Sequence, residues 1–173
     1  MSRIFGPIRQ LGYVVPDVEK EMKRWVTLGV GPWFYYQQFA VPEFCYNGIR
    51  KHTAIDLSVA FANSGDLQIE LINQRDDTPS MFKEFVGEGK EGMQHWAAWP
   101  ENYNEAYEQA LKMGLIIGQE GRTTRGRFAY FRAHPRSSEA IELSEASDDI
   151  KKFRSMVRDA AVVWDGANPI RRL

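Results

Sequence analysis

The chain has 173 residues and a formal net charge of -1, with 22 Lys and Arg residues against 23 Asp and Glu residues. This near balance makes nucleic acid a poor candidate partner. Hydrophobic residues make up 43% of the chain, which is too apolar for a disordered protein, and no apolar run reaches the roughly 18 residues of a membrane span. The single cysteine excludes an intramolecular disulfide, and the first residues lack the apolar stretch of a signal peptide. We therefore expect a globular protein of the cytoplasm.

The first half of the chain predicts one helix among several strands. Residues 8–15 are rich in β-branched and aromatic residues and run into a Pro-Asp turn, which is typical of a strand. Asp17 is a candidate N-cap for a helix whose apolar residues recur at helical spacing as far as Gly29. After these come an aromatic run at 33–36, a polar stretch at 42–51, and predicted strands at 54–61 and 67–72. The predicted order is β-α-β-β-β.

The same order is predicted again after a charged, glycine-containing connector. The second series consists of a strand at 93–99, a helix at 103–111, and strands at 115–118, 127–133 and 140–144. A final amphipathic helix is expected over 150–161, capped by Ser147 or Asp148. Its simplest role is packing over the core or against a second copy of the chain.

The spacings support a duplication. Gln10 precedes Gly29 by 19 residues, and His95 precedes Gly114 by 19 residues. Each series also closes on an Ile-Glu-Leu strand, at 69–71 and at 141–143. We therefore predict an α+β protein of two tandem βαβββ modules, with the first module at 1–75, the connector at 76–92, the second module at 93–146 and a helical tail at 147–173.

The repeat places four possible metal ligands at equivalent points. Gln10 and His95 lie in the opening strands, and Glu70 and Glu142 lie in the closing strands. If the two halves face each other, these side chains meet, and their oxygen and imidazole donors suit Zn²⁺, Ni²⁺, Co²⁺, Mn²⁺ or Mg²⁺. Taken singly, each has a more common explanation. A lone histidine is usually structural, and a strand carboxylate often faces solvent.

Aromatic side chains near this site are candidate substrate contacts. They are Trp33, Tyr35, Phe44, Tyr46, Trp96, Trp99, Phe128 and Tyr130. Strand alternation allows only about half of them to face inward, and a core position is the commoner role for such residues. Arg127 and its neighbours Arg122 and Arg125 could bind a carboxylate or phosphate group, although a solvated basic loop also explains them.

The sequence resembles the vicinal oxygen chelate superfamily, the group of glyoxalases, bleomycin-resistance proteins and extradiol dioxygenases. The resemblance rests on Ile8 to Asp17, the strand around Glu70, Gly92 to His95, and Ile141 to Ser144. It implies paired βαβββ modules that form a cupped mixed sheet around a metal ion, and a homodimer. The ligand order Gln, Glu, His, Glu is similar to that of eukaryotic glyoxalase I, whereas the glutamine at position 10 argues against an extradiol dioxygenase.

This resemblance implies a metal-dependent lyase or isomerase, of the glyoxalase or epimerase type. Such an enzyme removes a proton next to a carbonyl held by the metal, with Glu142 as the base and Glu70 as its partner on the opposite face. The substrate would be a small organic molecule, with a bulky apolar one favoured by the aromatic wall. One alternative is a metal-free binding protein of the bleomycin-resistance type. Another is a protein whose site has decayed and whose role is assembly.

Overall fold

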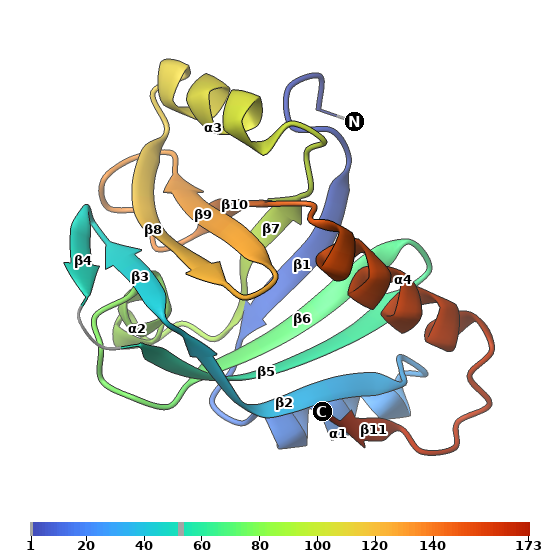
Figure 1. Ribbon diagram of the computed structural model, residues 1–173. Coiled ribbons are helices and arrows are strands. Elements are labelled where there is room, and N and C mark those ends of the chain that lie inside the picture. The colour runs from blue at the N-terminus through green and yellow to red at the C-terminus, as the bar shows by residue number, and fades with distance from the viewer. Residues whose placement is uncertain (1, 52–53) are drawn as a thin grey trace.

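The computed structural model describes residues 2–51 and 54–173, which form one large mixed sheet and four helices (Figure 1). The strands are β1 (Ile8–Val14), β2 (Trp33–Val41), β3 (Glu43–Tyr46), β4 (Ile49–Lys51), β5 (Ile55–Ser64), β6 (Leu67–Gln74), β7 (Gly92–Ala98), β8 (Ile116–Thr123), β9 (Gly126–Arg132), β10 (Ala140–Ser144) and β11 (Ile170–Arg172). The helices are α1 (Val18–Thr27), α2 (Met81–Gly87), α3 (Tyr103–Lys112) and α4 (Asp148–Val162). None of these helices is long and apolar enough to cross a membrane.

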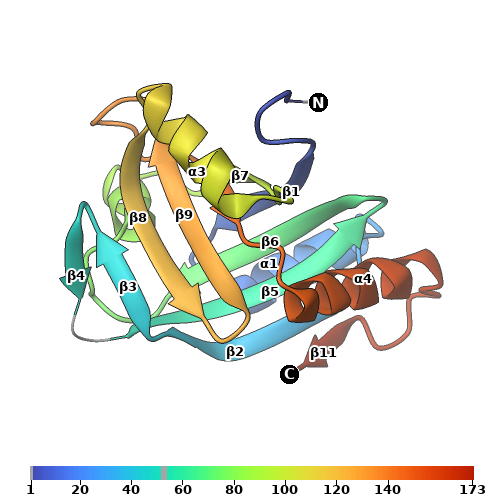
Figure 2. The ribbon, with the colours of Figure 1, turned by 45° about the horizontal axis from the view of Figure 1, so that its top comes forward.

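The sheet joins the two predicted modules at its centre. The strands follow the order β11-β2-β5-β6-β1-β7-β10-β9-β8-β3-β4. The two opening strands, β1 and β7, pair antiparallel at the centre of the sheet. In each half the closing strand, β6 or β10, lies next to the opening strand, and the other strands lie further out. This arrangement confirms the predicted fold class, a cupped sheet of two βαβββ units with a helical tail (Figure 2).

Two edge features differ from the sequence prediction. The polar stretch 42–51 forms the β3–β4 hairpin, and β3 leaves its own module to pair with β8 of the other. The end of the tail adds β11 as a parallel strand beside β2. Both segments are short, and β11 has no alternation or turn signal of its own. The β3–β4 hairpin does carry a local signal, because its turn is Asn47-Gly48, with φ values of +48° and +75°. Its pairing with β8 has no such signal, because β8 is distant in the chain.

The two repeated helices begin and end as the sequence predicts. The side chain of Asp17 accepts a hydrogen bond from the backbone nitrogen of Lys20, 2.9 Å away, and so caps α1. Gly29 and Gly114 follow α1 and α3 with φ values of +82° and +81°, in the left-handed region that favours glycine. Ser147, one of the two predicted caps, caps α4.

The helices cover different faces of the sheet. Helix α1 packs on the outer face of the first half, through Val18 and Met22, and α3 packs on the outer face of the second half, through Ala106 and Ala110. The concave face holds a third apolar cluster that includes side chains of α2. Helix α4 lies beside β5 at the other end of this face (Figures 1 and 2). The two faces of the sheet thus divide the core, and the concave face is where the two modules meet.

Candidate metal centre

The pairing of the two opening strands places the first two candidate ligands symmetrically. Gln10 lies opposite Ala97, and His95 lies opposite Gly12. Ala97 lies two positions after His95, and Gly12 lies two positions after Gln10. Each candidate ligand therefore faces a small residue of the opposing strand. A methyl group or a hydrogen at these points leaves room for a long side chain from the opposing strand. The duplication thus provides both the candidate ligands and the space for them.

The closing strands bring the two glutamates to the same place. Strand β6 pairs with β1 so that Glu70 lies opposite Gly12, and β10 pairs with β7 so that Glu142 lies opposite Ala97. Glu70, His95 and Glu142 form a cluster in which one ligand atom from each lies within 4.8 Å of the others. Three of the four predicted ligands therefore converge from three different strands.

The tautomer of His95 follows from its hydrogen bond to Gln94. The amide nitrogen of Gln94 donates to the backbone carbonyl of Ser138 at 2.7 Å, so its oxygen faces Nδ1 of His95 at 2.8 Å. An amide oxygen only accepts, so Nδ1 carries the hydrogen. In a neutral imidazole this leaves a lone pair on Nε2. That atom points toward the two carboxylates.

The cluster fits a divalent ion. Nε2 of His95 lies 3.4 Å from Oε2 of Glu70 and 3.3 Å from Oε2 of Glu142. Two ligand atoms about 2.0–2.1 Å from a tetrahedral ion lie roughly 3.3 Å apart, so these separations match. Nε2 of His95 and Oε2 of Glu142 are buried, and neither forms a hydrogen bond within the described part of the chain. Buried polar atoms without partners are costly, and an ion between them would satisfy both.

The charges in the cluster depend on one another. Burial lowers the pKa of His95, but its close contacts with the carboxylates of Glu142 and Glu70 outweigh burial and raise the pKa to about 9. Burial raises the pKa of Glu70, and repulsion from Glu142 adds to this effect. Without an ion, the imidazole is therefore protonated near neutral pH. An ion would replace that proton.

Gln10 shares the cavity of this cluster. It is buried, and its amide nitrogen donates to Oε1 of Gln68 at 2.9 Å, which leaves its own amide oxygen for another contact. Gln10, Glu70 and Glu142 all line one cavity of about 100 Å³ on the concave face. Its role as a fourth ligand stays a prediction.

Some of the predicted substrate contacts line this cavity and others do not. Phe44, Phe128, Tyr130 and Arg127 line it. Among these, the ring of Tyr130 packs edge-on against the imidazole of His95, with centroids 4.8 Å apart. Burial raises the pKa of the Tyr130 hydroxyl well above its usual value, and the nearby Glu142 and Glu70 add to this effect, so the hydroxyl stays protonated.

The remaining predicted contacts lie elsewhere because of strand alternation. Trp33 and Tyr35 pack against α1 on the outer face, and Trp96 packs with the α3 cluster. Tyr46 packs at the edge of the concave cluster, where its hydroxyl bonds to Glu84, and burial raises its pKa to about 12. Trp99 lies under the guanidinium of Arg154. The sequence could not assign these faces, because both sides of each strand are apolar.

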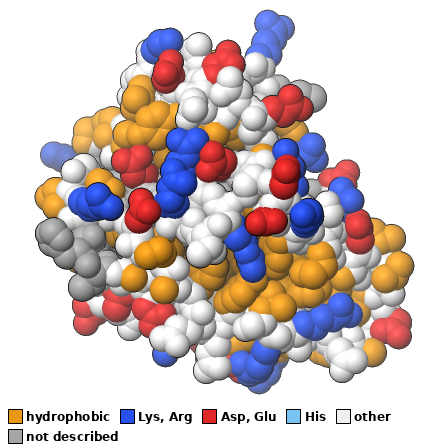
Figure 3. Space-filling view, in the orientation of Figure 1, with side chains coloured by type: hydrophobic (Ala, Val, Ile, Leu, Met, Phe, Trp, Pro, Cys, Tyr) orange, Lys and Arg blue, Asp and Glu red, His pale blue; other side chains and the backbone are white. Residues whose placement is uncertain are grey.

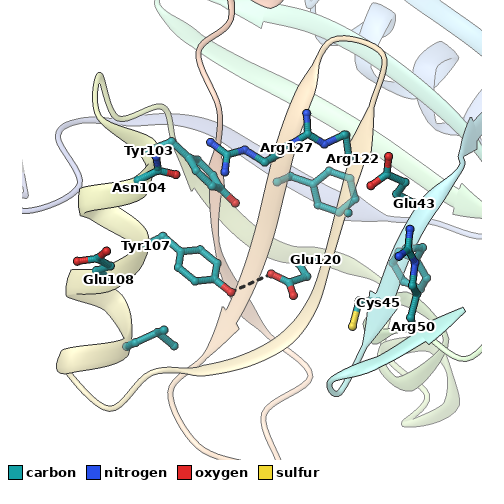
Figure 4. Close-up of a pocket in the computed structure, with 14 residues that line it drawn as sticks. Glu43, Cys45, Arg50, Tyr103, Asn104, Tyr107, Glu108, Glu120, Arg122 and Arg127 are labelled. Carbon is teal, nitrogen blue, oxygen red and sulfur yellow. Dashed lines mark hydrogen bonds between the residues drawn. The ribbon is translucent and has the colours of Figure 1, made fainter.

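A larger hollow, of about 730 Å³, lies between α3, β8 and β3, and it does not contain the carboxylate cluster (Figure 4). Arg127 lines both spaces, but its guanidinium pairs with Glu145 at 2.7 Å and lies over the ring of Tyr103. Tyr107 of α3 donates to Glu120 of β8 across the floor of this hollow. Because these polar groups already have partners, the cluster on the concave face remains the better candidate site.

Three residues of the site were not predicted from sequence. Gly12 leaves the space for His95, and Gln94 orients its ring. Arg154 of α4 lines the cavity as well. Arg154 had a visible signal, since it lies among Ile150, Phe153 and Val157 on the apolar stripe of the tail helix. A charged residue on such a stripe is unusual.

The Gln94 contact gives a first prediction. Changing Gln94 to Met removes the acceptor for Nδ1 of His95 and leaves the Ser138 carbonyl without its donor. Because such outer contacts orient a ligand, we expect metal affinity to fall by about 10 to 100-fold. Competition with a fluorescent zinc chelator measures this. The matched variant Gln109→Met, on α3, should bind as the unaltered protein does, and equal affinities for both variants would contradict the prediction.

The chain matches a known protein superfamily. A family model described as the glyoxalase, bleomycin resistance protein and dioxygenase superfamily matches residues 9–131. The chain belongs to this superfamily. The match confirms the resemblance drawn from the sequence motifs and covers both opening strands and the Glu70 strand. No curated protein sequence matches the chain.

Solved structures agree with this superfamily fold. A hypothetical protein from Bacillus halodurans has 18% identity and a TM-score of 0.59, covering 82% of this chain and 95% of that one. Methylmalonyl-CoA epimerase from Mycobacterium tuberculosis has 18% identity and a TM-score of 0.58, covering 88% and 95%. A Streptomyces coelicolor methylmalonyl-CoA epimerase variant, in complex with 2-nitronate-propionyl-CoA, has 13% identity and a TM-score of 0.55, covering 83% and 96%. At these identities the likeness concerns the fold.

Proposed function

We propose that this protein is a metal-dependent lyase or isomerase that removes a proton from carbon next to a carbonyl group. The observation that carries the proposal is the buried cluster of Glu70, His95 and Glu142, whose spacing suits a divalent ion. Within residues 2–51 and 54–173, Nε2 of His95 and Oε2 of Glu142 have no hydrogen-bond partner. Superfamily membership and the fold of the epimerases support the same reaction class.

The residues of the cluster would have two roles, metal binding and proton transfer. Glu70, His95 and Glu142, with Gln10 as a fourth donor, would hold Zn²⁺, Ni²⁺, Co²⁺, Mn²⁺ or Mg²⁺. Such an ion, when bound, acts as a Lewis acid that polarises a carbonyl and makes the neighbouring C–H more acidic. The Glu142 carboxylate then takes the proton, because it is buried and therefore little solvated. Glu70, across the cluster from Glu142, would be the partner group on the opposite face of the substrate.

The four candidate ligands are compatible with two reaction products. Return of the proton to the same carbon gives an epimerase, and return to the neighbouring carbon gives a glyoxalase-type product. The cavity volume of about 100 Å³ favours a small reacting group over the bulky substrate expected from the aromatic residues. The same small volume weighs against sequestration of a large drug.

A metal analysis combined with proton exchange tests the proposal. The purified protein should carry about one divalent ion per chain by mass spectrometry. His95→Ala should lose this ion, whereas His134→Ala, at an exposed turn, should keep it. In D₂O, the metal-loaded protein should exchange the carbon-bound protons of small 2-oxo and 3-oxo acids or of methylglyoxal, as followed by NMR, and Glu142→Gln should slow this at least 100-fold. An ion retained by His95→Ala would overturn the proposal.

We also propose a homodimer. Helix α4 exposes Met156 and Val162, and Val163 directly after it is exposed as well; Val162 and Val163 are 77% and 80% exposed. Hydrophobic side chains gather at the surface beside α4, with Lys and Arg around them (Figure 3). Light scattering should give twice the monomer mass of 19.9 kDa. A Val162→Lys, Val163→Lys double variant should shift the protein toward the monomer mass if α4 forms the contact.

A further inference from the structure

The tail helix places a charged side chain inside the candidate site. Ile150, Phe153 and Arg154 lie on one face of α4 and line the same cavity as Glu70 and Glu142. Phe153 packs edge-on against Phe61 of β5, with centroids 5.4 Å apart, and the guanidinium of Arg125 lies 4.7 Å from the centre of its ring. The helix is thereby held over the rim of the cup, which fixes Arg154 in place.

The guanidinium of Arg154 is buried and incompletely bonded. Its residue is only 8% exposed, and it lies 3.7 Å from the centre of the Trp99 ring. Nη2 donates to Oγ of Ser144 at 2.8 Å, while Nη1 is buried and has no hydrogen-bond partner among residues 2–51 and 54–173. In the same part of the chain, no carboxylate forms an ion pair with it. A buried charge without a partner is costly, so this arrangement points to a missing anion.

The charge balance of the cavity points the same way. Burial lowers the pKa of Arg154 to about 10, against the attraction of Glu142 and Glu70, so the side chain stays charged at neutral pH. A divalent ion would cancel the charges of Glu70 and Glu142. The buried guanidinium of Arg154 would then have no counterion, and Arg125, which also lines the cavity, forms no ion pair among the described residues either. An anionic group of the substrate beside Arg154 would supply that counterion.

We infer that Arg154, together with the hydroxyl of Ser144, binds a carboxylate group of the substrate beside the metal cluster. The planar guanidinium matches the geometry of a carboxylate, and Nη1 is the free donor. The Ser144 hydroxyl accepts from Arg154, so its own hydrogen is available to the same anion. The inference rests on the proposed function and narrows its substrate class to small carboxylates.

Binding of pyruvate and of its neutral analogue pyruvamide tests this inference. Both are titrated into the zinc-loaded and the metal-free protein by calorimetry and by tryptophan fluorescence. We expect pyruvate to bind the unaltered protein at least about tenfold more tightly than it binds Arg154→Gln, because a charge-assisted hydrogen bond is lost. Arg154→Lys should recover part of the affinity. Arg158→Gln, one turn further along α4 on its exposed side, should bind as the unaltered protein does.

The change in tryptophan fluorescence on pyruvate binding should come from Trp99, beside Arg154. Pyruvate should change the fluorescence of the unaltered protein, and Trp99→Phe should lose most of that change because the guanidinium lies against Trp99. Pyruvamide should bind the unaltered protein and Arg154→Gln equally. Circular dichroism and the melting temperature show whether Arg154→Gln is folded, and Arg154→Lys tests the same point if it is not.

The possible outcomes separate the two proposals. Equal binding of pyruvate to the unaltered protein and to a folded Arg154→Gln overturns the carboxylate site, even if metal binding and proton exchange are found. Equal binding of pyruvate and pyruvamide to the unaltered protein overturns it too. Pyruvate binding that depends on Arg154 in a protein that retains no metal supports the site and removes the proposed enzyme function.

Discussion

Replacing Gly12 with Ala should displace His95 and abolish tight metal binding. A Cβ atom at this position would lie 1.8 Å from Cε1 and 2.0 Å from Nε2 of His95. The imidazole is fully buried between β1 and Tyr130, so it has no free space to enter. We expect a loss of about 3 kcal/mol in the free energy of unfolding and at least a tenfold loss of zinc affinity.

Urea unfolding and chelator competition measure these two effects. Gly87→Ala is the matched control, because nothing lies within 4 Å of a Cβ there and its φ is not in the left-handed region. Gly87 belongs to α2, where alanine is the better helix former, so this variant should be as stable as the unaltered protein or slightly more stable. A Gly12→Ala protein that keeps full stability and zinc affinity would show that the ring of His95 lies elsewhere.

Stability of the metal-free protein should fall as pH rises from about 6.5 to 9. Glu142 and Glu70 raise the pKa of His95 from 6.5 to about 9 against the effect of burial. Between these values the folded protein holds a proton that the unfolded chain has lost. The resulting stabilisation is fully present below pH 6.5 and disappears as pH passes 9, a difference of roughly 3 kcal/mol.

Urea unfolding in the presence of a chelator, at half-unit steps from pH 6 to 9.5, gives this profile. His95→Gln should lose the fall, because it has no group that titrates at this position. Zinc should also release about one proton per chain at pH 7, since the ion replaces the proton on Nε2. Calorimetry in buffers with different ionisation enthalpies counts that proton. A flat stability profile together with no proton release would show that the imidazole is neutral in the metal-free protein.

The duplicated pattern accounts for how much of the fold could be predicted. The helix after Asp17 carries local signals, namely the cap, the apolar stripe and the glycine stop, and α3 carries the stripe and the glycine stop. Such signals depend only on neighbouring residues, so sequence alone reveals them. The pairing of β3 with β8 and of β11 with β2 carries no such signal, because these partners are distant in the chain.

The candidate site was also only partly predictable from the sequence. Equivalent positions in the two repeats singled out Gln10, Glu70, His95 and Glu142, and three of these meet in the cluster. Which aromatic residues line the cavity depended on the facing of each strand. Trp33 and Tyr35 lie on the face that packs against α1, whereas Tyr130 lies on the face that lines the cavity.

By itself, the sequence determined that two similar βαβββ units would place polar residues at equivalent points, because repeat spacing and strand alternation are local properties of the chain. Only the tertiary structure decided that Gly12 makes room for His95, that Gln94 orients it, and that Arg154 enters the cavity from the tail. These contacts join residues from different strands and from a helix far along the chain. They exist only once the two halves have paired and α4 has packed across the cup.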